Sequence, residues 1–344
     1  MEITIPQSKI VKTIAILMML CLHLFNRPYE SLFQPLFFMG KQPVSYYISL
    51  FSDACVPIFL FISGYGLYFK YKKNNNTFAK ENLTRIGKLY INYWIVVVLF
   101  AVLLGLMLDK EGYPGSMSKF LVNFFALDNS YNGAWWFLFT YILLTFTSPI
   151  LFKLMHACNS WLFIASVLGF YFFSFYFRFY NNALFTNPYL GWLFKQVYLY
   201  GISLFPFIAG AMVLQKKGHS QFSERFNKLR FKSLLAILGI FVLVAIHGVI
   251  PNLVIAPFLA IPFIFLWNQI VLSKWLERFL LWLSPHTTNL WLIHMFFYLT
   301  YFSEIIYAPK NPILIFSWLL LWSVLASFLV NFIYKPIVKK NILI

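Results

Sequence analysis

Long apolar runs separated by short polar segments make up almost the whole sequence. Ten of these runs have the length, about 20 residues, that a helix needs to cross the hydrocarbon core of a bilayer. They lie at 11–31, 44–69, 89–108, 135–155, 160–177, 197–215, 233–250, 253–271, 279–300 and 313–334. The pattern predicts an all-α, polytopic membrane protein with about ten transmembrane helices and an interfacial helix near 118–127. Residues 1–344 are expected to form a single integral-membrane domain with no separate soluble domain.

The basic residues lie mainly at the ends of the apolar runs. If the N-terminus lies in the cytoplasm, 20 of the 27 Lys and Arg residues fall in cytoplasmic segments and 7 fall outside. This distribution follows the positive-inside rule and predicts that both termini are cytoplasmic. Only 11% of the residues are charged, against about 25% in a soluble domain. The net charge of +17 is therefore attributed to membrane topology and not to a nucleic-acid partner.

Few titratable side chains fall inside the predicted spans, and each is a candidate for function because such groups are costly in a membrane. The three cysteines show no metal-ligand spacing, so they are interpreted as small apolar residues and no metal is expected. The candidates are His23, Asp53, His156, His247, His286 and His294.

Lys12 and His23 bound the stretch KTIAILMMLCLH in the first span. Eleven helical steps are close to three full turns and rise about 16 Å, so both side chains are predicted on one face. Lys12 would lie at the cytoplasmic edge and His23 near the middle of the membrane. The pair suggests a ligand along the helix, with its anionic end at Lys12 and its reactive end at His23. A histidine is a natural general base, with an ordinary pKa near 6.5. A topogenic Lys12 and a His23 bonded to a neighbouring helix remain the alternatives.

Apart from Glu30 at the end of the first run, Asp53 is the only acid in a predicted span, and it lies in the same half of the membrane as His23 by helix rise. Its carboxylate could hold the His23 imidazole in one tautomer, as in hydrolase triads. The alternative is a polar outer mouth in which Asp53 binds substrate or a counter-charge.

A short repeat places FISG at 61–64 and FIAG at 207–210, and a lysine follows each at equal spacing. Small residues allow two helices to approach closely, and this packing explanation is preferred for the repeat. At Ser63 and Gly64, a slender ligand chain is the other candidate for the close approach.

The order of these motifs resembles membrane-bound acyltransferase family 3, the bacterial integral-membrane sugar O-acyltransferases. Lys12 and His23 match its basic residue and histidine with ten residues between them, although the family more often has arginine first, which binds phosphate in a bidentate way. VPIFLFISGY matches its Phe-rich run ending in Ser63 and Gly64. Three further segments agree, LTRIGKLYINYW with Arg85 and Lys88, GAWWFLFTYIL with Trp136, and NLWLIHMFF with His294. Many members have an aspartate directly before two phenylalanines, whereas Asp53 lies several residues upstream.

The resemblance implies transfer of an acetyl or other short acyl group from acetyl-CoA to a hydroxyl of a cell-envelope glycan or lipid-linked sugar. It implies a multi-pass protein of the bacterial inner membrane, whose partners are acyl-CoA, the sugar acceptor and the lipid bilayer. His23 and Asp53 would be catalytic. Trp136 and His294 would contact substrate. The CoA part of the donor would be bound by Lys12, Ser63, Gly64, Arg85 and Lys88.

A transporter or flippase for envelope sugars is the alternative function. It explains the many spans and the aromatic content, 22% of residues, equally well. It does not explain why Lys12 and His23 share one helix face, and no clear inverted repeat supports it.

Overall fold

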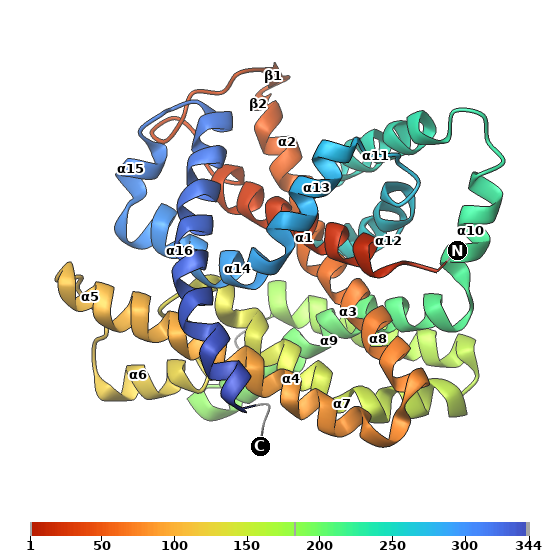
Figure 1. Cartoon of the computed structure of the whole chain (residues 1–344), viewed down its shortest axis with the longest axis horizontal. Helices are drawn as coiled ribbons and strands as arrows, with labels where there is room; N and C mark the ends of the chain where they lie inside the picture. Colours follow the sequence, from red (N-terminus) through yellow and green to blue (C-terminus); the bar gives the residue numbers. More distant parts are fainter. Residues whose placement is uncertain (1, 182–183, 342–344) are drawn as a thin grey trace. The chain divides into compact units, whose positions relative to one another are not determined.

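The structure is a computed structural model that describes residues 2–181 and 184–341, and helices dominate it (Figure 1). Hydrogen bonding within each helix satisfies the backbone polar groups that a bilayer cannot solvate, which is why apolar runs of this length become helices. The α-helices are α1 (Ile5–Phe25), α2 (Val44–Phe51), α3 (Cys55–Lys73), α4 (Asn75–Val96), α5 (Leu104–Met107), α6 (Met117–Phe124), α7 (Trp136–Ala157), α8 (Ser160–Phe179), α9 (Pro188–Gln215), α10 (Gly218–Phe226), α11 (Lys232–Val249), α12 (Ala256–Trp267), α13 (Lys274–Leu283), α14 (Thr287–Met295), α15 (Ser303–Tyr307) and α16 (Pro312–Asn341).

Several short elements connect these helices. The 3₁₀ turns are η1 (Ser52–Ala54), η3 (Gly133–Trp135), η4 (Leu253–Ile255) and η5 (Ser284–His286), and two segments are π-helical, η2 (Val97–Leu103) and η6 (Phe296–Tyr301). A two-residue antiparallel ladder joins β1 (Phe38–Met39) to β2 (Gln42–Pro43). The predicted all-α class is therefore confirmed.

Eight helical segments among the described residues are long and apolar enough to cross a membrane. They are Ile5–Phe25, Val44–Lys73, Asn75–Met107, Gly133–Ala157, Ser160–Phe179, Pro188–Gln215, Lys232–Val249 and Pro312–Lys339. Of the other two predicted spans, 253–271 contains the shorter apolar helix Leu253–Trp267, and 279–300 is divided between α13, η5, α14 and η6. The protein is thus a polytopic membrane protein, while the number ten and the cytoplasmic termini stay predictions. The helix expected near 118–127 is α6.

The chain divides into two compact units that interleave along the sequence. The first unit consists of Met1–Ala15, Asp53–Asn82 and Thr140–Leu281, and the second of Ile16–Ser52, Leu83–Phe139 and Trp282–Ile344. Each unit therefore joins segments that are distant in the sequence. The expectation of a single domain over 1–344 stays a prediction.

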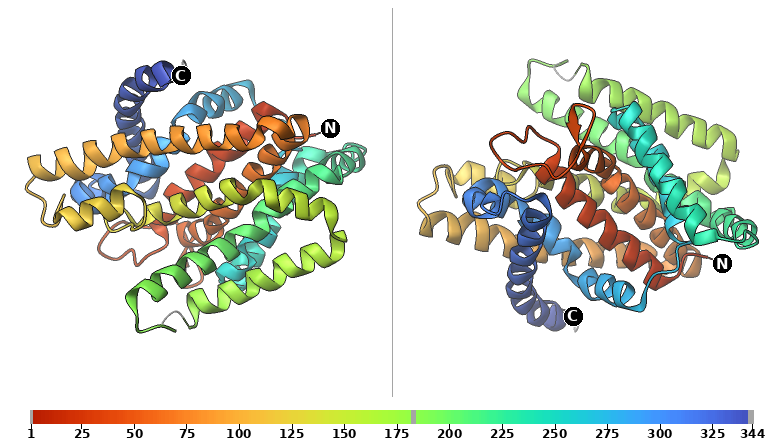
Figure 2. Two further views of the ribbon diagram at one scale, coloured as in Figure 1. Left: turned by 90° about the horizontal axis from the view of Figure 1, so that it is seen from below. Right: turned by 90° about the horizontal axis from the view of Figure 1, so that it is seen from above.

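The first unit is built around α9, which packs against both α3 and α8. Figure 2 shows α8 and α9 side by side. A Cβ added at Gly64 would lie 1.8 Å from the carbonyl oxygen of Phe207, and one added at Gly210 would lie 2.0 Å from that of Phe61. FISG and FIAG thus pack against each other, each glycine receiving the backbone of the other motif. This reciprocal contact accounts for the repeat by helix packing.

In the second unit, two tryptophans attach the start of α7 to α14. Trp135 Nε1 donates to the carbonyl oxygen of Leu292, and Trp291 Nε1 donates to that of Ala134, both at 2.9 Å. The side chain of Asn132 also donates to the Leu292 carbonyl. These bonds lie directly beside His294 in the chain, so they hold the backbone that carries it.

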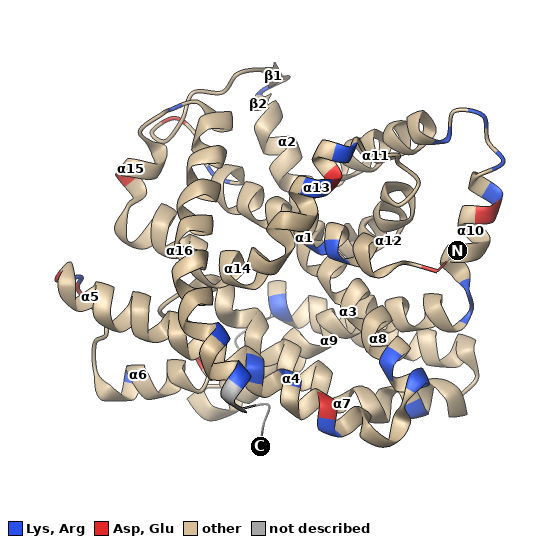
Figure 3. Cartoon of the chain, in the orientation of Figure 1, with Lys and Arg blue, Asp and Glu red and all other residues tan. Residues whose placement is uncertain are grey.

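The basic residues lie mostly at helix ends and in connecting loops, and acidic residues are few (Figure 3). In the second unit, basic residues occur on α4 and on the C-terminal part of α16. Charges at these places avoid the hydrocarbon core, as topology requires.

Candidate functional site

The side chains of His23 and His294 meet in the second unit through a hydrogen bond. Nδ1 of His23 lies 2.7 Å from Nε2 of His294. The two ring planes differ by 3° and the ring centroids are 4.9 Å apart, farther than the two nitrogens. The rings therefore meet edge to edge in nearly one plane, which is the geometry of a good N–H···N bond.

The surroundings of His294 define the tautomer of both rings. Nδ1 of His294 lies 3.0 Å from the carbonyl oxygens of Leu290 and Trp291. A carbonyl only accepts, so Nδ1 of His294 carries the proton and its Nε2 has the free lone pair. That lone pair must receive a proton from Nδ1 of His23. The Nε2 atom of His23 is consequently left unprotonated, with a lone pair available as a base.

Tyr298 and Arg27 complete the surroundings of the imidazole pair. The ring of Tyr298 is close to parallel with both imidazoles, with centroids 6.2 Å from His23 and 5.9 Å from His294. The guanidinium carbon of Arg27 lies over the Tyr298 ring, 5.1 Å from its centroid. Nε of Arg27 is buried and has no hydrogen-bond partner among the described atoms. A cation with an Nε–H that has no partner among the described atoms thus lies against the tyrosine ring that neighbours both histidines.

Three further predicted residues belong to the same unit. Arg85 and Lys88 are half-buried on α4, and Trp136 is half-buried at the first position of α7. Trp136 packs edge-on against Phe137, with centroids 5.6 Å apart. His294 itself is fully buried, whereas His23 is half-buried. Of the two, only His23 therefore has exposed surface.

Lys12 is on α1 together with His23, as predicted, but it belongs to the first unit. Its ammonium group lies 5.2 Å from the centroid of the Phe59 ring, a cation–π arrangement. The helix begins at Ile5 and ends at Phe25, so it starts and ends earlier than the predicted 11–31.

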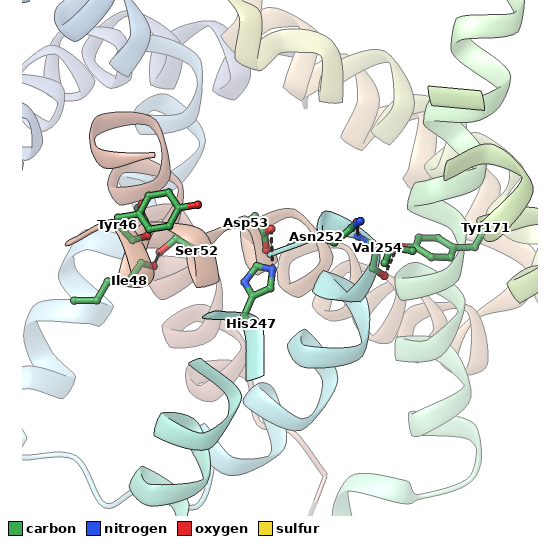
Figure 4. Close-up of polar contacts among 9 residues, drawn as sticks. Tyr46, Ile48, Ser52, Asp53, Tyr171, His247, Asn252 and Val254 are labelled. Carbon is green, nitrogen blue, oxygen red and sulfur yellow. Dashed lines mark hydrogen bonds and ion pairs between the residues drawn. The ribbon is translucent and has the colours of Figure 1, made fainter. Parts of the chain in front are cut away.

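Asp53 contacts His247, a partner that the sequence did not predict (Figure 4). Oδ2 of Asp53 lies 3.3 Å from Nε2 of His247, and both side chains are buried in the first unit. The expected carboxylate partner of His23 is replaced in the structure by the imidazole of His294. Asp53 is therefore a member of a second buried polar pair, built from η1 and α11.

Ser63 and Gly64 are buried on α3. The backbone of Phe207 occupies the space beside Gly64, so helix packing accounts for this glycine and leaves no room there for a donor chain. The hydroxyl of Ser63 has no hydrogen-bond partner among the described atoms. Within the described part of the chain, no group of three His, Cys, Asp or Glu side chains could hold a metal ion.

The chain is thus a polytopic helical membrane protein in which a half-buried histidine is hydrogen-bonded to a fully buried one, near an arginine. A family model described as an acyltransferase domain matches residues 6–332, nearly the whole chain. The chain belongs to this family, acyltransferase family 3, and is a membrane acyltransferase. Neither the comparison with curated proteins nor the comparison with solved structures gave a match.

Sequence reasoning missed two members of the site, Arg27 and Tyr298. Arg27 was counted among the basic residues outside the membrane, and Tyr298 was one of 21 tyrosines. Their spacing carried a signal, because each follows a site histidine by four positions. Residues four apart are neighbours on a helix surface, although in the structure Arg27 follows the last residue of α1 and Tyr298 lies in the π-helical segment η6.

Proposed function

We propose that this membrane acyltransferase moves an acetyl or other short acyl group from acetyl-CoA to a hydroxyl of a cell-envelope glycan or lipid-linked sugar in the bacterial inner membrane. The observation that carries the proposal is the hydrogen bond between His23 and His294, which leaves a lone pair on His23 Nε2. A base beside a fixed cation is what transfer of an acyl group to an alcohol needs.

In this mechanism, Nε2 of His23 removes the proton of the acceptor hydroxyl. The hydroxyl oxygen attacks the thioester carbon and a tetrahedral intermediate forms, with its negative charge on the former carbonyl oxygen. Collapse of the intermediate breaks the carbon–sulfur bond, and the thiolate of CoA takes the proton from the His23 imidazolium. The products are the O-acyl sugar and CoA. A route through an acyl group on His23 Nε2 uses the same nitrogen as nucleophile.

His294 acts as a positioning residue in this scheme. It accepts the Nδ1 proton of His23 and so keeps the basic lone pair on Nε2, the task that a carboxylate has in hydrolase triads. Arg27 offers positive charge and a buried Nε–H to the oxygen that becomes negative in the intermediate. Such preorganised donors act strongly where water is excluded.

The donor and acceptor would use the other polar groups of the second unit. Arg85 and Lys88 carry positive charge for the phosphates of CoA. Trp136 offers a half-buried aromatic face for a sugar. Asp53 has no step in this mechanism, because its observed contact is to His247.

A purified preparation in nanodiscs tests the proposal. The protein is incubated with radiolabelled acetyl-CoA and an envelope extract as the acceptor source, and both released CoA and acetylated glycan are measured. The wild type should release CoA in proportion to the acetylated glycan that it forms. His23→Ala should release no CoA and form no acetylated glycan, while its thermal stability stays at the wild-type level. A transporter or flippase would release no CoA, and full activity of a folded His23→Ala protein would remove the mechanism.

A further inference from the structure

Hydrogen bonds among mostly buried amide and hydroxyl groups connect α4, α14 and α16 in the second unit. Figure 1 labels these three helices. Asn92 Nδ2 donates to Asn289 Oδ1 at 2.7 Å. Asn289 Nδ2 donates to Ser327 Oγ at 2.9 Å and to Asn331 Oδ1 at 3.1 Å. His286 Nδ1 lies 2.9 Å from the same Ser327 hydroxyl. The mechanism proposed above uses none of these groups.

The orientation of the amides follows from these bonds. The amino group of Asn289 points toward α16, where it donates to the oxygens of Ser327 and Asn331. The side-chain oxygen of Asn289 therefore faces α4. Asn92 must then direct its own amino group at Asn289. The carbonyl oxygen of Asn92 is left over, and it is buried with no partner among the described atoms. Asn92 as a whole is only 7% exposed. Native proteins rarely leave a buried acceptor unsatisfied, so this oxygen calls for a donor that the protein itself does not supply.

Helix register aligns Asn92 with the two basic residues of α4. Arg85 and Lys88 precede it by seven and four positions, so all three lie on one side of the helix. The rise from Arg85 to Asn92 is about 10 Å. If the anionic end of a ligand lies at Arg85 and Lys88, the part of the ligand about 10 Å from that end would therefore lie at Asn92.

The same network leads toward the histidine pair. Asn289 and His294 are both on α14, five residues apart, a rise of about 7.5 Å. Two π-helical segments follow directly, η2 after α4 and η6 after α14. They contact each other, since Tyr301 Oη donates to the carbonyl oxygen of Phe100 at 2.7 Å. π-Helical turns occur frequently at functional sites, which favours a ligand site in this part of the second unit.

We infer that the carbonyl oxygen of Asn92 accepts a hydrogen bond from an amide N–H of the pantetheine arm of the acyl donor. The inference rests on the proposed function and adds a donor-binding residue to it. Pantetheine is a slender chain with two secondary amides between its phosphate end and its sulfur. An N–H is the group that a lone buried carbonyl oxygen lacks. Asn289 positions the Asn92 amide so that its oxygen faces the donor, and Asn331 Oδ1 still accepts from Asn289 when the Ser327 hydroxyl is absent.

The test compares donors as well as protein variants. Acetyl-pantetheine lacks the nucleotide and phosphates of acetyl-CoA but keeps both amides. Asn92→Leu should raise the KM for acetyl-CoA about tenfold at nearly unchanged kcat, which is about 1.4 kcal/mol of lost uniform binding. The same factor should appear with acetyl-pantetheine. Arg85→Gln should weaken binding of acetyl-CoA only, because its partner phosphates are missing from acetyl-pantetheine.

Ser327→Ala is the matched control within the network. This variant removes the hydroxyl that accepts a hydrogen bond from Asn289, and it leaves the Asn92 oxygen in place. It should therefore change the KM for acetyl-CoA by much less than Asn92→Leu does. Equal effects of the two variants on KM would show that the network is only structural and would overturn the inference.

A second measurement does not depend on the folding of any variant. In analogues of acetyl-pantetheine, each amide N–H is replaced in turn by an ester oxygen, which removes one donor and keeps the shape. One analogue should bind the wild type about tenfold more weakly than the parent compound. If wild type turns over acetyl-CoA but both analogues bind as tightly as the parent, the inference is wrong and the proposed function stands. If wild type neither binds nor turns over acetyl-CoA, the proposed function itself fails.

Discussion

Nδ1 of His23 lies 2.7 Å from Nε2 of His294, although the two residues are 271 positions apart in the chain. The bond joins the first helix to a helix near the C-terminal end, within one compact unit. The carbonyl oxygens of Leu290 and Trp291 accept a hydrogen bond from Nδ1 of His294. Together with the bond between the histidines, these contacts determine which nitrogen of His23 is basic.

Replacing His23 by alanine removes the proposed base. The expected loss in kcat is about 10³-fold, within the range that general-base catalysis contributes. The measurement is the initial rate of acetyl-CoA-dependent CoA release by the purified variant. Thermal unfolding in the same detergent controls for folding, and a stable variant with wild-type kcat would contradict the role.

The role of His294 is tested by two substitutions that differ in one respect. A glutamine can still accept the Nδ1 proton of His23 through its side-chain oxygen, whereas a leucine cannot. His294→Gln should therefore retain clearly more kcat than His294→Leu, with the KM for acetyl-CoA similar in both. If the two variants lose activity equally at equal stability, His294 does not act through the tautomer of His23.

Arg27 is expected to act on the transition state and not on donor binding. Arg27→Gln should lower kcat about 10²-fold, the size of effect seen when one preorganised donor of an oxyanion site is removed. Arg27→Lys keeps the charge and should recover part of that loss. Steady-state kinetics with acetyl-CoA checks this, since a change confined to KM would assign Arg27 to binding.

Lys12 has two candidate roles, binding of the donor and definition of the cytoplasmic end of α1, and steady-state kinetics can distinguish them. If it binds the anionic part of the donor, Lys12→Gln should raise the KM for acetyl-CoA several-fold at unchanged kcat, because uniform binding is lost. If it only marks the cytoplasmic end of α1, KM should not change. Arg85→Gln, measured in parallel, provides the reference for the loss of a donor-binding cation.

Gly64→Ala should destabilise the first unit, because the added Cβ would lie 1.8 Å from the Phe207 carbonyl oxygen. Overpacking of this kind costs about 1–3 kcal/mol. Gly66→Ala on the same helix is the matched control, since a Cβ there meets nothing within 4 Å. Thermal unfolding in detergent should show a lower Tm for Gly64→Ala than for Gly66→Ala, and equal values would contradict the packing explanation.

The two predicted spans that differ most from the structure show where hydropathy reaches its limit. The run 279–300 is apolar enough for one helix, yet it contains Ser284 and Pro285 and is divided into α13, η5 and α14. Proline lacks an N–H and interrupts helical bonding, so the backbone turns where the apolar pattern continues. Five of the motif residues come from segments that are far apart in the sequence, and only the fold shows that they belong to one compact unit. They are His23, Arg85, Lys88, Trp136 and His294.

The all-α membrane class, the helix that carries Lys12 and His23, and the family resemblance all follow from the sequence alone. These features depend on local properties, namely apolar length, helical register and short motifs. Three contacts could be seen only in the folded chain: His23 pairs with His294, Asp53 pairs with His247, and Phe207 occupies the space beside Gly64. The physical reason is that a hydrogen bond depends on which helices pack together, and packing joins residues whose separation in the chain carries no information about their distance.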